Sequence, residues 1–172
     1  MKKTDSTRTL VLCALLSAGA LALGYLETLL PLPLPIPGAR LGLGNVMVLL
    51  ALLLLGKKAA CAVAAVKVAL SALLFGSPIS FLYAAAGTLL ALTGMLLLNG
   101  RKAVSPIGQS MAGATLHNLG QVLVAMALTA TPRLMIYFSF LTPLGLLTGA
   151  LSGFIAQKSA SLLKKNKRGI GL

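Results

Sequence analysis

The chain has 172 residues, of which 58% are hydrophobic and only 10% are charged. A soluble domain of this length cannot hide so much apolar surface, because much of its residue complement must face water. The formal net charge of +13 does not indicate a nucleic-acid-binding protein, since the positive residues form short clusters between apolar runs, where anionic lipids and the positive-inside rule account for them. The composition therefore predicts an integral membrane protein whose main partner is the lipid bilayer, with no nucleic acid bound.

Six apolar runs follow one another, and none shows the alternating pattern of a membrane barrel strand. Because helices satisfy their backbone hydrogen bonds within lipid, we predict an all-α bundle of six transmembrane helices over residues 10–156. Residues 1–9 and the basic residues 157–172 are predicted cytoplasmic tails. The second and third runs are short for a span of about 20 residues. The runs cover residues 10–30, 41–55, 59–75, 79–98, 107–130 and 134–156.

The first run follows three basic residues and therefore shares some features with a signal peptide. It continues well past the small residues at 18–20, and its removal would leave an odd number of helices. We therefore expect a retained first helix.

One face of this first helix carries small residues at four-residue spacing, Ala14, Ala18 and Ala22. Stripes of small side chains allow two membrane helices to approach closely. The partner helix belongs either to the same bundle or to another protein. A second stripe in the last run is expected to pack within the bundle and consists of Gly145, Gly149 and Gly153.

Between the first two runs, residues 31–38 alternate proline with apolar residues. Such a sequence holds the chain in a stiff, extended polyproline-II path, which serves either as a rigid connector or as a lid over a binding site. Arg40 follows, and then Gly42 and Gly44 permit a close backbone approach where the chain re-enters the membrane.

The distribution of positive charge sets the predicted orientation. With the N-terminus inside, twelve of the fifteen Lys and Arg residues fall in inside segments, and only Arg40 and Arg133 fall outside. The remaining one, Lys67, lies within a helix. The positive-inside rule then predicts that both termini face the cytoplasm.

Polar side chains within the apolar runs give the main functional signal, because each costs free energy in lipid and must face protein, water or a ligand. At ~1.5 Å per residue, Lys67 lies about 12 Å and His117 about 15 Å from the inner end of its helix. Gln121 lies one turn further out on the same face as His117. Glu27 is expected near the outer surface beside Arg40, about 13 Å above Lys67.

These positions predict a cavity that opens to the outside, with Lys67 as a cationic floor on which a ligand anion binds. The alternative is that the polar groups satisfy one another between helices, which applies most directly to Tyr83 and Asn118. We predict no catalytic residue, metal site or cofactor. The predicted ligand-binding residues are Glu27, Arg40, Asn45, Lys67, Tyr83, His117, Asn118 and Gln121.

Several segments together resemble the Gx transporter family, also labelled heptaprenyl diphosphate synthase component I. The resemblance covers roughly residues 10–156. The segments that carry it are Gly24-Tyr25-Leu26-Glu27, the proline-rich loop, residues 38–45, residues 74–77, Phe81-Leu82-Tyr83 and His117-Asn118-Leu119-Gly120-Gln121.

That family is in turn similar to the S components of energy-coupling factor (ECF) vitamin transporters. The resemblance implies six helices, an external first loop over the ligand, and an alanine ladder on helix 1 that docks a transmembrane T component with its ATPase subunits. The ladder matches Ala14, Ala18 and Ala22. We therefore expect a substrate-binding subunit in a bacterial cytoplasmic membrane that serves the uptake of a small anionic or polar-headed molecule.

The family label leaves a second interpretation open, a non-catalytic accessory subunit of isoprenoid or quinone synthesis. Prenyl diphosphate synthases hold Mg²⁺ with clustered aspartates. The only acidic residues of this chain are Asp5 and Glu27, so we do not expect it to be an enzyme by itself.

Overall fold

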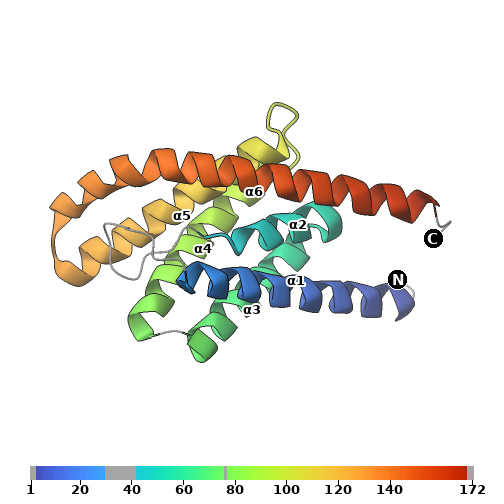
Figure 1. Cartoon of the computed structure of the whole chain (residues 1–172), viewed down its shortest axis with the longest axis horizontal. Helices are drawn as coiled ribbons and strands as arrows, with labels where there is room; N and C mark the ends of the chain where they lie inside the picture. The colour runs from blue at the N-terminus through green and yellow to red at the C-terminus, as the bar shows by residue number, and fades with distance from the viewer. Residues whose placement is uncertain (1–2, 30–41, 76, 170–172) are drawn as a thin grey trace.

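The computed structural model describes residues 3–29, 42–75 and 77–169 (Figure 1). All the regular structure in these ranges is helical, and no strand occurs among them. The elements are α1 (Lys3–Leu29), α2 (Asn45–Leu55), α3 (Lys57–Phe75), α4 (Pro78–Leu98), α5 (Pro106–Thr129), the short 3₁₀ helix η1 (Pro132–Met135) and α6 (Ile136–Gly169). The prediction of an all-α chain is confirmed. The proline-rich loop and Arg40 lie outside the described residues.

Local signals in the sequence explain where α4 and α5 begin. Pro78 and Pro106 stand in the first turn of these helices, where the missing N–H has no helical partner to lose. The hydroxyl oxygens of Ser77 and Ser105 cap them, because each accepts a backbone N–H three residues further on.

Two helices are longer than the apolar runs that predicted them. α1 begins at Lys3 and not at residue 10, and α6 continues from residue 156 to Gly169. An apolar run ends where lysines and serines appear, whereas a helix continues through lysine, which is a good helix former. α6 is also continuous through Pro143, although proline within a helix commonly causes a kink, and it bows gently along its length (Figure 1).

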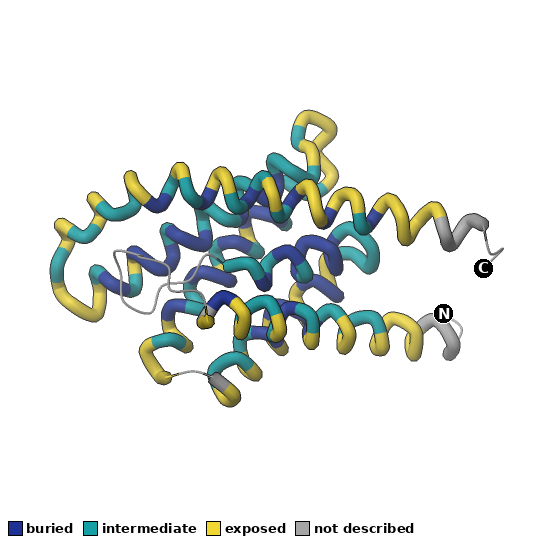
Figure 2. The backbone as a smooth tube through the Cα atoms, in the orientation of Figure 1, coloured by how far each residue is buried: buried dark blue, intermediate teal, exposed yellow. Residues whose placement is uncertain are grey.

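The shortest helix, α2, is the centre of the bundle. It packs against all of α1, α3, α4, α5 and α6. Figure 2 shows that buried residues concentrate in this middle layer, whereas α1 and α6 expose much of their length. Six of the eleven residues of α2 are buried, which explains why this run is almost continuously apolar and has no polar face.

Glycines bring α6 directly against α5. A Cβ atom added at Gly149 would lie 2.6 Å from Met111 Cα, and one at Gly153 would lie 2.7 Å from Ile107 Cα. Such contacts leave no room for any side chain. The glycine stripe therefore packs within the bundle, as the sequence predicted.

Among the described residues, four segments are long and apolar enough to cross a membrane: Ser6–Glu27, Pro78–Leu98, Pro106–Thr129 and Pro132–Lys165. α2 is apolar but has only 11 residues, about 16 Å of helix against a hydrocarbon core of about 30 Å. The two ends of the chain lie at the same end of the bundle (Figure 1).

Candidate ligand-binding site

The site is built around the point where α2 begins. The chain enters α2 through Gly42, whose φ of +80° lies in the left-handed region that favours glycine. The successive backbone N–H groups of Gly42 and Leu43 both donate to the carboxylate of Glu27, at 2.8 and 3.1 Å. Two adjacent N–H groups of this kind form an anion-binding nest. Glu27 therefore fixes α1 to the start of α2.

Lys67 of α3 lies beside the first residue of α2. Its Nζ atom donates to Asn45 Oδ1 at 2.6 Å and to Thr88 Oγ1 at 3.4 Å, and its side chain is only 8% exposed. The stem of the side chain packs on Gly44, since a Cβ added there would lie 3.1 Å from Lys67 Cε. The ammonium group is thus held inside the bundle by groups from α2 and α4.

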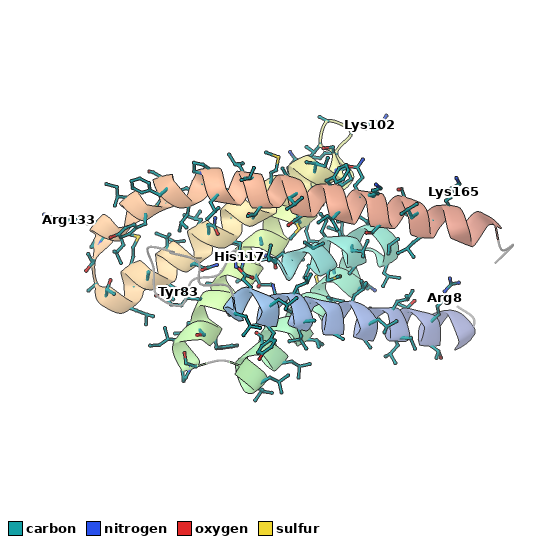
Figure 3. The ribbon with its side chains drawn as sticks, viewed as in Figure 1. Arg8, Tyr83, Lys102, His117, Arg133 and Lys165 are labelled. Atoms are coloured by element: carbon teal, nitrogen blue, oxygen red, sulfur yellow. The ribbon has the colours of Figure 1, made fainter. Side chains whose placement is uncertain are left out.

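A cavity of about 30 Å³ lies next to this ammonium group, enough for about two water molecules. Five of the eight predicted ligand-binding residues line it: Glu27, Lys67, Tyr83, His117 and Gln121. All five are buried. Residues from α1, α3, α4 and α5 thereby meet at one place. Figure 3 shows Tyr83 and His117 in the inner part of the molecule, away from both of its ends.

Two glycines hold the imidazole of His117 between them. A Cβ at Gly42 would lie 2.9 Å from His117 Cδ2, and a Cβ at Gly87 would lie 2.7 Å from both Cε1 and Nδ1. Real Cβ atoms do not approach other atoms this closely. The ring therefore occupies a slot that only glycine leaves open on both sides.

The structure places the remaining predicted site residues elsewhere. Asn118 faces α6, and its Nδ2 donates to the backbone oxygen of Leu141 at 2.9 Å, so it joins two helices. Asn45 is not among the residues that line the cavity, although it holds Lys67. Its buried Nδ2 makes no hydrogen bond to the described residues. Arg40 lies outside the described residues.

From helix rise, we expected Glu27 to lie about 13 Å above Lys67. In the structure, both residues line the same cavity. An estimate from rise per residue considers only helix axes, whereas Lys and Glu side chains extend well away from them.

Sequence reasoning did not select three polar residues that line the cavity, Ser71, Ser80 and Thr88. A signal existed for Ser71, which lies four residues after Lys67 and therefore on the same helix face. Thr88 interrupts an apolar run in the same way as the residues that we did select, but hydroxyl groups in helices commonly bond to their own backbone, so their presence says little alone.

The alanine ladder of α1 points away from the bundle. Ala14, Ala18 and Ala22 are exposed, while Ser17 and Ala20 on the opposite face are buried. The closely packed neighbour that such a stripe allows is therefore not another helix of the described chain.

The chain was compared with known proteins. A family profile described as heptaprenyl diphosphate synthase component I matches residues 16–159, which is more than half of the 172 residues. No match was found among curated proteins and none among solved structures. The match agrees with the family that the sequence motifs indicated. With its four helices that are long and apolar enough to cross a bilayer, the chain is a multi-pass membrane protein that belongs to the heptaprenyl diphosphate synthase component I family.

Proposed function

We propose that the chain is the substrate-binding component of a membrane uptake system and that it binds an anionic or polar-headed molecule beside Lys67. The observation that carries the proposal is the start of α2 inside the bundle, next to a buried ammonium group and a polar cavity. Membrane transporters commonly bind their substrates at interrupted helices whose N-termini lie within the membrane and face anionic groups. α2, with 11 residues, has the length of such a half-helix.

The electrostatics of the site favour a ligand anion. The N-terminus of a helix carries a partial positive charge of about half a unit, which together with the charge of Lys67 exceeds the single negative charge of Glu27, the carboxylate that lines the same cavity. A lysine within lipid costs at least ~2.5–3.5 kcal/mol on insertion scales, and a ligand anion would offset more of that cost than the neutral oxygens of Asn45 and Thr88 do. The unbonded Nδ2 of Asn45 is a further donor close to the cavity.

In this proposal all six α-helices are embedded in a bacterial cytoplasmic membrane, and both termini face the cytoplasm. Figure 3 is consistent with this orientation, since Arg8 and Lys165 lie near the end that holds both termini and Arg133 lies at the opposite end. α2 and α3 are then shielded by their neighbours, because α2 is largely buried and α3 packs against α1, α2 and α4. The exposed ladder of α1 is the proposed docking face for a T-type subunit with its ATPases.

Native mass spectrometry of the gently purified protein tests the proposed function. We expect a small molecule that remains bound to the wild-type chain and is lost from the Lys67→Met variant. An Asn118→Ala variant is a useful comparison, because Asn118 bonds to α6 and does not line the cavity. A retained molecule that is equally abundant in wild type and Lys67→Met would contradict the proposed site.

A second candidate function follows from the family description, which names a synthase component. In that case the chain is an accessory subunit of isoprenoid or quinone synthesis, and catalysis lies in a partner protein. Pull-down from the native membrane distinguishes the two proposals: ATPase subunits favour transport, whereas a prenyl diphosphate synthase whose activity rises on addition of this chain favours the accessory role.

A further inference from the structure

A second hollow lies on the outer surface of α3 and α4. It is an apolar groove of about 300 Å³ that opens sideways from the bundle. The residues that line it are Cys61, Ala64, Ala65, Val68, Ala85, Thr88, Leu89 and Leu92. Apart from the hydroxyl of Thr88 and the thiol of Cys61, this lining is aliphatic.

Thr88 lines both the groove and the polar cavity beside Lys67. Its hydroxyl is 3.4 Å from Lys67 Nζ. On α4, Ala84 also lines the cavity while Ala85 lines the groove, and on α3 the same division separates Lys67 from Val68. The two hollows therefore lie on opposite sides of one helix seam and approach each other at Thr88.

The side chains at this seam are small. Ala64, Ala84 and Ala85 occupy little of the space between the two hollows, which they line. A molecule that lies across the seam displaces few side-chain contacts. The α3–α4 seam is thus the candidate lateral passage between the cavity and the bilayer.

The sizes of the two hollows indicate how a ligand is divided between them. The polar cavity, at about 30 Å³, has room for a single small head group, whereas the apolar groove, at about 300 Å³, is tenfold larger. Resting on the proposed function, we propose that the ligand is a single-chain amphiphile. Its anionic head group binds beside Lys67, and its apolar chain crosses the seam at Thr88 and lies in the groove.

The length and position of the groove favour this occupant over two others. Its lining spans residues 61–68 of α3 and 85–92 of α4, about 10 Å along each helix. A partner helix would need a face along the ~30 Å of the hydrocarbon core. A bilayer phospholipid keeps its head group at the membrane surface, whereas Lys67 lies ten residues, or about 15 Å, from the inner end of α3.

Alkyl phosphates of two chain lengths test the proposal, with dodecyl phosphate and butyl phosphate as probes and uncharged dodecanol as a third. Binding to the purified full-length chain is measured by native mass spectrometry in lipid nanodiscs. We expect wild type to bind dodecyl phosphate at least about tenfold more tightly than butyl phosphate. Because the longer chain also partitions into nanodisc lipid, the contribution of the groove is the part of this preference that a groove-filling variant loses. Dodecanol is expected to bind at least about tenfold more weakly than dodecyl phosphate, because it lacks the charge that pairs with Lys67.

A matched pair of α3 variants tests whether the alkyl chain of the ligand lies in the groove. Ala65→Leu fills the groove, whereas Ala62→Leu makes the same change at an exposed position outside it. Ala65→Leu is expected to weaken binding of dodecyl phosphate without affecting butyl phosphate, and Ala62→Leu to leave both affinities unchanged. Thermal unfolding of both variants should match wild type, since both side chains face lipid. Lys67→Met should weaken the binding of both phosphates by at least about tenfold.

Three outcomes would contradict the proposal that the ligand is a single-chain amphiphile. Equal binding of both phosphates, weakened by Lys67→Met, would leave the proposed function standing with a ligand confined to the polar cavity. A nanodisc phospholipid that stays bound and is not displaced by dodecyl phosphate would assign the groove to bilayer lipid. Binding of dodecyl phosphate that depends on neither Lys67 nor Ala65 would refute both parts of the proposed site. The proposed function would then be tested only by whether the purified protein retains a small molecule from the cell.

Discussion

Lys67 is the residue whose presence most needs an explanation. Burial of its charge costs at least ~2.5–3.5 kcal/mol on insertion scales, and two hydrogen bonds, to Asn45 and Thr88, offset part of that cost. Hydrogen bonds that involve a charged group contribute about 1.5–3 kcal/mol each at best, and the bond at 3.4 Å is long. A ligand anion beside the ammonium group would offset more of this cost than the neutral oxygens of Asn45 and Thr88 do, which directs attention to binding.

We predict that Lys67→Met folds and binds the ligand poorly. The substitution removes the buried charge but leaves Asn45 Oδ1 without its donor, which costs about 1–3 kcal/mol, so the two effects on the free energy of unfolding nearly cancel. Ligand binding should weaken by about 1.5–3 kcal/mol. Thermal unfolding and binding are to be measured on the same samples in detergent. A destabilised variant with normal binding would show that Lys67 is structural.

A second residue-scale prediction concerns the slot that holds His117. Gly87→Ala would place a Cβ atom 2.7 Å from the imidazole and 3.0 Å from the backbone oxygen of His117. Either the ring or the α4–α5 packing must shift, and such overpacking typically costs about 1–3 kcal/mol. The midpoint of thermal unfolding should fall, and ligand binding should be lost with the position of the ring.

Gly108→Ala on α5 is the matched control for this change. A Cβ at Gly108 would lie 3.6 Å or more from its neighbours, which is ordinary contact. The substitution should therefore leave stability unchanged or raise it slightly, because alanine favours a helix over glycine by about 0.5–1 kcal/mol. If the two glycine variants behave alike, the slot does not constrain His117.

At the scale of elements, α1 has two faces with different tasks. Glu27 and Ala20 on the inner face are buried, and Glu27 holds the start of α2 through the N–H groups of Gly42 and Leu43. The outer face carries the exposed alanine ladder. Substitutions on the two faces should therefore have separable effects on folding and on association.

We predict that Ala18→Leu weakens association with a T-type subunit and leaves the fold intact. Ala18 is exposed, so a larger side chain meets lipid and no helix of the chain, but it prevents the close approach of a partner helix. Ala127→Leu is the control, because Ala127 is also exposed and lies on α5, which is not among the helices that contact α1 in the described residues. Pull-down yield and thermal unfolding are the measurements. Unfolding of Ala18→Leu would indicate packing within the bundle.

At the scale of the whole molecule, both ends of the chain lie at one end of the bundle (Figure 1), which requires an even number of membrane crossings. We predict that both termini are cytoplasmic, because twelve of the fifteen positive residues then lie inside. Tags at each terminus should react with an impermeant reagent only after the cells are opened. Labelling of the C-terminal tag in intact cells would reverse the orientation.

Much of this protein is determined by sequence alone. The apolar runs predicted the all-helical membrane class, and Pro78 and Pro106 marked helix starts, because hydropathy and helix-start signals are properties of neighbouring residues. The motifs around Glu27 and His117 indicated the family. Polar residues in apolar runs identified five of the eight charged or polar residues that line the cavity, since a polar group in lipid is costly wherever it occurs.

Tertiary structure decided how those residues are used. Asn118 and His117 are adjacent in the sequence, yet one bonds to Leu141 and the other lines the cavity. The contact of Glu27 with the nest at Gly42 and the place of Thr88 between two hollows were equally beyond the sequence. Such features depend on which helix faces meet and how closely two backbones approach. Residue spacing determines the direction of a side chain around its own helix axis, but not the neighbour that lies in that direction.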